Sequence, residues 1–319
     1  MIAPKVTPPK VTRTHSPHKI KGRASLSILI PFYRDNPSEL IEKLSSIACS
    51  SVEILTYDDG TGDKDLSRDV SAAIKSAACQ ATLFTAHENR GRAFGRNYLF
   101  NAAKADWVLF LDADMMPMSD HFIDAYLNEI KAATSDVLFG GFKVAETRGR
   151  QETEIHRVLS IMSDCATASE RQRLGPKNVA SSNLCVRKEV LITEPFDTGF
   201  KGWGWEDSEW AARVSTSFRL KHIDNPALHL GLETTDTMLK RFRTSGVNYI
   251  RFTQRHPDLA ASLPLYKWVT RLRKIPGHQL LRPFLKLTVK VNQTPMKLRI
   301  AALKLWRASW YAEVNHDPS

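Results

Sequence analysis

Trp-Val-Leu-Phe-Leu-Asp-Ala-Asp-Met-Met-Pro, residues 107–117, is the stretch that decides the fold. Its first five residues are apolar and rich in strand formers, which predicts a buried β-strand. Asp112 and Asp114 follow directly, so both carboxylates fall on the same side of an extended segment. Neighbouring carboxylates repel each other unless a cation lies between them, and oxygen ligands of this kind suit Mg²⁺ or Mn²⁺. About one Asp-x-Asp is expected by chance in a chain of this length, so the flanking sequence must decide.

Predicted strands and helices alternate along the chain on both sides of this stretch. The strands are expected at 25–32, 52–57, 81–85, 107–111 and 136–142. Helices are expected near 40–47, 67–78 and 119–133, and another after residue 92 carries 96–98. Alternation at this spacing predicts an α/β fold with a mostly parallel, Rossmann-like sheet flanked by helices. Ligands of such sheets bind beyond the carboxyl ends of the strands. Three successive predicted strands end there in polar groups: Asp58-Asp59, the loop 89–96, and Asp112–Asp114.

The regular alternation of predicted strands and helices ends after residue 145. A second unusual stretch occurs at 202–209, Gly-Trp-Gly-Trp-Glu-Asp-Ser-Glu. Glycine weakens helices and strands alike, which favours a loop here. Two tryptophans in a loop beside three acids indicate a binding surface, the alternative being that the rings belong to the core. Asp207 or Ser208 is expected to cap a helix at 209–217. Residues 220–230, which follow, contain His222 and His229.

The net charge of +11 is unevenly distributed. Residues 1–23 hold six Lys or Arg and no acid, and residues 240–319 hold sixteen against three acids. The middle, 24–239, is net negative with 23 basic and 31 acidic residues, which argues against a nucleic-acid groove there. We therefore expect a disordered basic arm at 1–23, a catalytic domain at 24–239 and a basic helical extension at 240–319.

The basic extension has apolar residues at helical spacing, such as Leu265, Trp268, Val269, Leu272 and Ile275, with lysines and arginines between them. Basic amphipathic helices with aromatic residues are typical of proteins that bind the surface of an anionic membrane. The alternative is that these apolar faces pack on the rest of the protein. No apolar run is long enough to span a bilayer, and the four scattered cysteines form no metal or disulfide pattern. A cytoplasmic protein at the inner face of the membrane is expected.

Four sequence blocks, in order, resemble those of the GT-A nucleotide-sugar glycosyltransferases, most nearly glycosyltransferase family 2. They are 27–33 (Ser-Ile-Leu-Ile-Pro-Phe-Tyr), 57–63 (Tyr-Asp-Asp-Gly-Thr-Gly-Asp), 89–91 with Arg96-Asn97, and 112–114. Residues 202–209 are similar to the acceptor-site block of these enzymes and to the carboxyl-terminal motif of β1,4-galactosyltransferase-like proteins. The resemblance covers about residues 25–235. Thr61-Gly62-Asp63 departs from the usual Ser-Thr-Asp without a large chemical change.

The resemblance implies roles for particular residues. Asp114, with Asp112, would hold Mn²⁺ or Mg²⁺, and His229 is a candidate third ligand. Asp207 would be the catalytic base, while Glu206, Trp203 and Trp205 would bind the acceptor. The nucleotide-sugar donor would be bound by Pro31, Phe32, Tyr33, Asp58, Asp59, Asn89, Gly91, Arg96, Asp112 and Ala113. Each of these assignments has an alternative. Asp58-Asp59-Gly60 could be only a turn, Arg96 could be a charge on a helix surface, and His229 could be a packed or exposed side chain without a ligand role.

The expected function is inverting, metal-dependent transfer of a sugar from a nucleotide sugar, a UDP-sugar, to a glycan or lipid-linked saccharide. The product would be a β-glycoside in polysaccharide or glycolipid synthesis. A sugar nucleotidyltransferase shares the α/β sheet and the metal carboxylates, but the residues after the first strand, Pro31–Asp35, are not a glycine- and lysine-rich phosphate loop. A membrane-associated carbohydrate-binding protein would use Trp203 and Trp205 and leave the aspartates unexplained.

Overall fold

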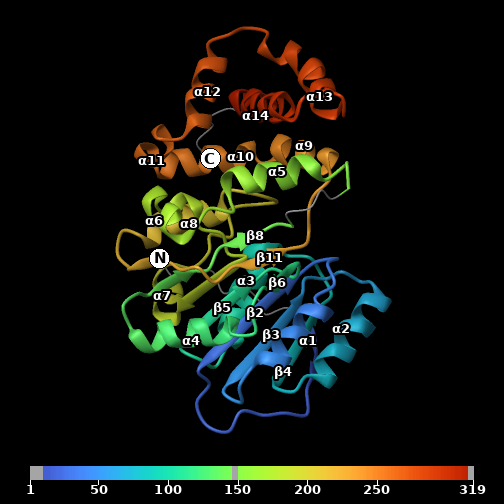
Figure 1. The fold of residues 1–319 in the computed structure, drawn as a ribbon, viewed down its shortest axis with the longest axis vertical. Coiled ribbons are helices and arrows are strands. Elements are labelled where there is room, and N and C mark those ends of the chain that lie inside the picture. The colour runs from blue at the N-terminus through green and yellow to red at the C-terminus, as the bar shows by residue number, and fades with distance from the viewer. Residues whose placement is uncertain (1–9, 146–149, 315–319) are drawn as a thin grey trace. The chain divides into compact units, whose positions relative to one another are not determined.

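Residues Trp107–Leu111 form strand β5, inside an eight-stranded sheet of the computed structural model (Figure 1). The structure describes residues 10–145 and 150–314. The strand order is β1-β4-β3-β2-β5-β9-β7-β10. These strands are β1 Val11–His15, β2 Leu26–Phe32, β3 Val52–Asp58, β4 Gln80–Ala86, β5, β7 Val137–Phe139, β9 Asn183–Arg187 and β10 Leu220–His222.

The centre of the sheet is parallel. Strands β2, β3, β4 and β5 run in the same direction, whereas β1 is antiparallel to β4, and β9 is antiparallel to β5 and β7. Every residue of β3 and β5 is buried, as expected of strands covered on both faces. The predicted α/β fold with a mostly parallel sheet is confirmed, and the carboxyl ends of β2 to β5 share one edge.

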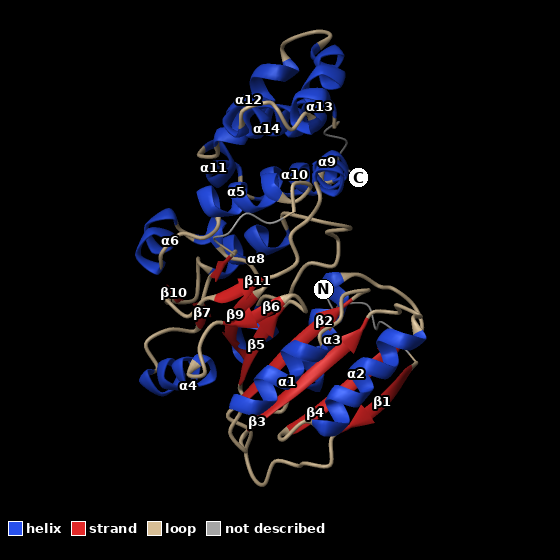
Figure 2. Cartoon of the chain, turned by 45° about the vertical axis from the view of Figure 1, so that its right-hand side comes forward, coloured by secondary structure: helices blue, strands red, loops and turns tan. Residues whose placement is uncertain are grey.

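Helices follow the strands along the chain, and α1 and α2 lie side by side on one face of the sheet (Figure 2). Asp63 begins α2, because its carboxylate accepts hydrogen bonds from the amides of Asp65 and Leu66. The helices and short elements here are α1 Ser38–Ile47, α2 Lys64–Ser76, α3 Arg92–Ala102, β6 Met115–Pro117, α4 Phe122–Ala132 and α7 Lys188–Thr193.

The predicted disordered arm at 1–23 is wrong for residues 11–15. Val-Thr-Arg-Thr-His forms β1, whose register pairs Val11 with Ala86 and His15 with Thr82. The prediction gave weight to the prolines and charges and overlooked the strand formers Val11, Thr12 and Thr14. These suffice to form a strand when a neighbouring strand has unpaired backbone groups. Residues 1–9 of the predicted arm lie outside the described residues.

The chain folds into two compact units built from alternating segments. The first contains the sheet and comprises residues up to 140, 180–196 and 218–227. The second comprises 141–179, 197–217 and 228–319, so the predicted boundary at 239 differs from this division. The predicted extension at 240–319 shares one unit with the segments that hold the tryptophans and acids of 202–209.

The second unit is mainly helical. Helix α14 packs along α12 and α13 (Figures 1 and 2), and its Trp306 and Tyr311 each belong to a buried apolar cluster. None of the helices in the described ranges combines the length and apolarity needed to cross a membrane. The elements are β8 Phe142–Lys143, α5 Glu154–Ser163, α6 Ala168–Leu174, η1 Pro176–Asn178, α8 Glu206–Val214, β11 Ala227–His229 (whose first residue belongs to the first unit), α9 Thr235–Thr244, α10 Gly246–Arg255, α11 Pro257–Ala261, α12 Pro264–Arg273, η2 His278–Leu281, α13 Arg282–Lys290 and α14 Met296–Glu313.

Candidate functional site

The turn after β3 is built around Asp59. Its two carboxylate oxygens accept hydrogen bonds from the backbone amides of Arg90 and Gly91, each at 2.8 Å. Asp59 is 5% exposed, and burial raises the pKa of its carboxyl above the usual value of 3.8, against the lowering effect of these two hydrogen bonds. Asp59 therefore ties the end of β3 to the loop after β4, which is more than a turn residue needs to do.

Two further contacts fix this turn. Asp58 accepts a hydrogen bond from the amide of Thr61 at 2.9 Å and is 2% exposed. Gly60 has a φ of +74°, and a Cβ added to it would lie 2.5 Å from the backbone carbon of Glu88. Only glycine allows the two loops to approach this closely.

Arg96 lies on α3 but is not the surface charge that the alternative interpretation described. Its side chain is 1% exposed, and Nη2 lies 3.2 Å from Oδ1 of Asp112. The guanidinium also lies 5.6 Å from the ring centre of Phe196. The structure thus brings Arg96 to the first carboxylate after β5, where a fixed guanidinium can orient that carboxylate.

The two aspartates after β5 lie in a tight turn. The amide of Met115 donates to the carbonyl of Asp112 at 3.1 Å, and Asp112, Ala113 and Asp114 are all half-buried. Among the described residues no group of three or more His, Cys, Asp or Glu could hold a metal by itself. Two accessible carboxylates still fit Mg²⁺ or Mn²⁺, because such ions often bind through one or two carboxylates together with substrate phosphates.

The three residues predicted from the first block differ in exposure. Phe32 is buried at the end of β2, and Pro31 is half-buried. Tyr33 is 38% exposed, and the guanidinium of Arg34 lies over its ring at 4.9 Å. The amide of Arg34 donates to the hydroxyl of Thr61 at 3.0 Å, which joins this segment to the turn after β3. Of the three, Tyr33 has the ring that is available for stacking.

These residues form what we call the strand-end cluster: Tyr33, Asp58, Asp59, the loop 89–91, Arg96, and Asp112 to Asp114. The hydrogen bonds of Asp59, the hydrogen bond of Arg34 and the Arg96–Asp112 ion pair join segments that follow four different parallel strands. The sequence had placed these side chains at the same edge of the sheet, and the described contacts agree.

The second candidate region, residues 202–209, is here called the tryptophan–acid block. Trp203 is half-buried beside Phe242, with ring centres 5.7 Å apart. Trp205 is also half-buried, 4.9 Å from the ring of Phe252, and its indole N–H donates to the hydroxyl of Tyr311 at 3.3 Å. Each ring therefore packs on an apolar cluster of the second unit with one side and keeps part of its surface accessible.

Helix α8 begins earlier than the sequence predicted. It starts at Glu206, so Asp207 lies in its first turn rather than capping a helix that starts at 209. Trp205 is the N-cap, with a φ of +76° that non-glycine residues adopt rarely. The prediction failed because it looked for an Asp or Ser cap, whereas Trp205 occupies the N-cap position and makes no side-chain cap hydrogen bond. Glu206 is 8% exposed and Asp207 is half-buried.

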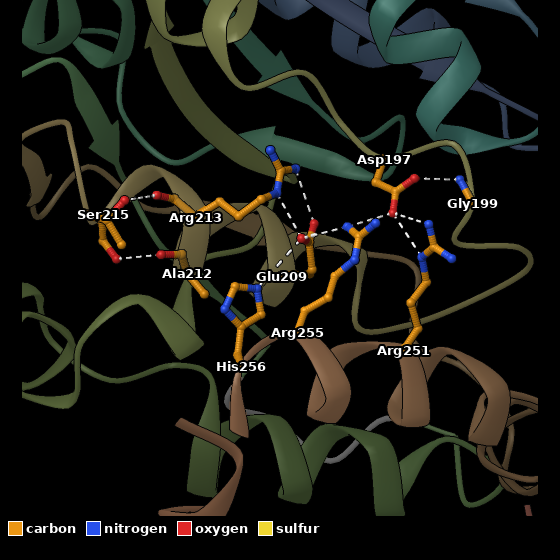
Figure 3. Close-up of polar contacts among 10 residues, drawn as sticks. Asp197, Gly199, Glu209, Ala212, Arg213, Ser215, Arg251, Arg255 and His256 are labelled. Carbon is orange, nitrogen blue, oxygen red and sulfur yellow. Dashed lines mark hydrogen bonds and ion pairs between the residues drawn. The ribbon is translucent and has the colours of Figure 1, made fainter. Parts of the chain in front are cut away.

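The same helix is anchored by Glu209, which is fully buried. Figure 3 shows its carboxylate between Arg213, Arg255 and His256. Arg213 Nε lies 2.7 Å and Arg255 Nη1 lies 3.0 Å from Oε1. Arg255 also pairs with Asp197 at 2.8 Å, so the helix start is linked to the segment that precedes the block. The sequence interpretation gave Glu209 no role, although an acid three residues after Glu206 at helical spacing was visible.

Asn248 was missed entirely by sequence reasoning. It lies on α10, is 4% exposed, and its amide donates to the carbonyls of Lys201 at 2.9 Å and Gly204 at 3.0 Å. Its side-chain oxygen accepts from the amide of Lys201 at 3.3 Å. A buried asparagine that satisfies a glycine-containing loop leaves no sequence signal, because its partners are backbone groups 44 to 47 residues away.

His229 ends β11 in the second unit, whereas Asp112 and Asp114 belong to the first. Its ring lies 5.6 Å from Phe142 and 5.8 Å from His156. Ligation by His229 remains a prediction. His222, to which the sequence gave no role, is 5% exposed in β10 beside Phe139.

Comparison with known proteins identifies the family. The sequence pattern of Glycosyl transferase family 2 matches residues 27–191, just over half of the chain. No curated protein matches the sequence. The fold is similar to a mannosyltransferase, PcManGT from Pyrobaculum calidifontis, solved with GDP-Man and Mn²⁺ (16% identity, 95% of this chain and 89% of that chain, TM-score 0.51). It is also similar to residues 1–349 of TarS from S. aureus, solved with UDP-GlcNAc (15% identity, 90% and 91%, TM-score 0.50).

Proposed function

The chain belongs to glycosyl transferase family 2, and on this premise we propose that it transfers a sugar from a UDP-sugar to a hydroxyl of a glycan or lipid-linked saccharide. The observation that carries the proposal is the strand-end cluster, in which contacts of Arg34, Asp59 and Arg96 join the segments after four parallel strands. In this proposal Tyr33 stacks on the base, Asp58 and Asp59 accept hydrogen bonds from uracil or ribose, and the loop 89–91 completes the pocket. Pro31, Phe32, Asn89, Gly91 and Ala113 line it.

Asp114, with Asp112, is proposed to hold Mn²⁺ or Mg²⁺, with His229 as a further ligand. When bound, the ion neutralises the departing diphosphate as a Lewis acid. Arg96 keeps Asp112 oriented and is itself a candidate for the base or diphosphate. The mannosyltransferase of similar fold binds GDP-Man together with Mn²⁺, which supports a divalent ion in this family.

Asp207 is proposed as the base that deprotonates the acceptor hydroxyl. Glu206 would hold the acceptor, and the accessible parts of Trp203 and Trp205 would stack on a sugar ring. A hydroxyl that attacks opposite the departing diphosphate inverts the configuration, so an α-linked donor gives a β-glycoside. We further propose that the acceptor is carried on lipid in polysaccharide or glycolipid synthesis, and that the enzyme meets it at the cytoplasmic face of an anionic membrane.

Metal-dependent hydrolysis of a nucleotide sugar tests the core of this proposal. Purified protein should release UDP from a UDP-sugar with Mn²⁺, and Asp114→Ala should lower that rate by about a thousandfold, because a metal supplies several kcal/mol of charge stabilisation. The matched control is Asp124→Ala, which removes an exposed carboxylate from α4 and should leave the rate unchanged. Mn²⁺ titration of His229→Ala checks the third ligand, and unchanged metal affinity would argue against it.

The same measurement separates the alternatives. A nucleotidyltransferase would form the nucleotide sugar from sugar phosphate and nucleoside triphosphate and would release pyrophosphate. A carbohydrate-binding protein would bind saccharides with no turnover, and its binding would not change in Asp114→Ala. UDP release that is equally fast without divalent metal would contradict the proposed role of Asp112 and Asp114.

A further inference from the structure

The C-terminal helices expose an unusual concentration of large apolar side chains. Seven of the fifteen that are exposed in the described part of the chain fall within residues 268–298. Leu280 is 74% exposed, Phe284 70% and Leu287 61%. The others are Trp268, Ile275, Leu281 and Leu298. Scattered exposed apolar residues are ordinary, but a group of this kind marks an interaction site.

The two sides of α13 differ sharply. Val289 is fully buried in a cluster with Trp306 of α14, and Leu285 packs against that cluster. Leu280, Phe284 and Leu287 recur at spacings of four and three, which aligns them in one stripe on the other side. We call Leu280, Leu281, Phe284 and Leu287 the η2–α13 face. The sequence left open whether the apolar residues of this region pack internally or face a membrane; α13 packs one side internally and exposes the other.

The chain segment that carries this face is basic. Between Asp258 and Glu313 there is no acidic residue and there are eleven lysines or arginines. Four of these have partners within the protein. Arg282 donates to Ser309 and pairs with Glu313, and Arg299 donates to the carbonyl of Val289. Lys290 pairs with Asp236, and Arg307 donates to the hydroxyl of Tyr311. Five lysines are exposed and pair with no acid among the described residues: Lys267, Lys274, Lys286, Lys297 and Lys304.

We propose that the η2–α13 face docks on the surface of an anionic bilayer, with its apolar stripe in the headgroup–acyl boundary and the lysines on lipid phosphates. A second copy of the chain is disfavoured, because it would bring the same positive charge against itself. Such docking would bring the enzyme to a lipid-linked acceptor, and this use of it rests on the proposed function. The docking itself rests on exposure and charge alone.

Co-sedimentation with vesicles tests the proposal. Wild-type protein should sediment with vesicles of phosphatidylcholine and phosphatidylglycerol, less at high salt, and not with phosphatidylcholine alone. The triple variant Leu280→Gln/Phe284→Gln/Leu287→Gln should bind at least about tenfold more weakly, because each removed side chain takes apolar area out of the bilayer. The matched control, Ile161→Gln/Met162→Gln/Val247→Gln, removes three side chains of similar exposure elsewhere in the second unit and should bind like wild type.

Equal binding of the triple variant and wild type would overturn the proposal, as would a lipid-free dimer that the triple variant converts to monomer. Two activity measurements distinguish a wrong docking proposal from a wrong proposed function. The triple variant should hydrolyse a UDP-sugar with Mn²⁺ at the wild-type rate without vesicles. Conversely, Asp114→Ala should lose hydrolysis and keep vesicle binding.

Discussion

The strand-end cluster and the tryptophan–acid block are held in place by different physical means. The first is fixed by backbone amides on Asp59 and by the Arg96–Asp112 pair, all between segments that directly follow parallel strands. The second is fixed by ring packing of Trp205 and by the buried carboxylate of Glu209, with partners on α10 and α14. The predicted extension at 240–319 is therefore structural support for the block, and not an appendage.

The largest expected effect separates the two regions by function. Asp207→Asn should lower transfer to an acceptor by about 10²- to 10⁴-fold, because the base that accepts the hydroxyl proton is lost. Donor binding should stay at the wild-type level, since the strand-end cluster is untouched. Transfer rates and donor affinity, measured by calorimetry, check this. Near wild-type transfer would remove Asp207 from the role of base.

A second substitution tests how the block is held. Glu209→Gln should lower the free energy of unfolding by about 2 kcal/mol, since it removes the buried charge that pairs with Arg213 and Arg255, although Arg255 keeps Asp197 and the partial exposure of both arginines reduces the cost. Thermal unfolding followed by circular dichroism measures this change. Transfer should fall as well, because α8 carries Asp207.

The control for this experiment is Glu152→Gln, which removes a 58% exposed carboxylate in the same unit. Its unfolding temperature should match the wild type. If Glu209→Gln were equally harmless, the buried ion cluster would not be what holds the start of α8.

The smallest expected effect concerns the strand-end cluster. Asp59→Asn leaves one oxygen for two backbone amides and should weaken donor affinity by about tenfold, the cost of roughly one lost hydrogen bond in a half-buried loop. Because burial raises the pKa of Asp59 in the folded protein, the contribution of this group to stability should fall as pH rises from 3.8 through the raised value. The free energy of unfolding of wild type relative to that of Asp59→Asn should therefore fall over this range, which denaturation of both proteins at several pH values measures.

The sheet and the strand-end cluster could be predicted because local patterns determine them. Apolar runs that end in Asp58-Asp59 and Asp112–Asp114 indicate both the strand and the edge where its ligands lie. The support of the tryptophan–acid block could not be predicted in the same way. Asn248 donates to backbone carbonyls, and Trp205 is an N-cap without a side-chain cap hydrogen bond, so neither follows a local rule. The strand β1 was missed because its pairing partner lies about 70 residues away.

That first strand has a consequence for how the protein is handled. β1 is the outermost strand beyond β4, so it occupies backbone groups that would otherwise be open to any passing extended chain. β4 is apolar, with Ala81, Leu83 and Phe84 buried. A shortened chain that starts at Ser25 would uncover this strand, and we expect it to aggregate although every candidate site residue is retained.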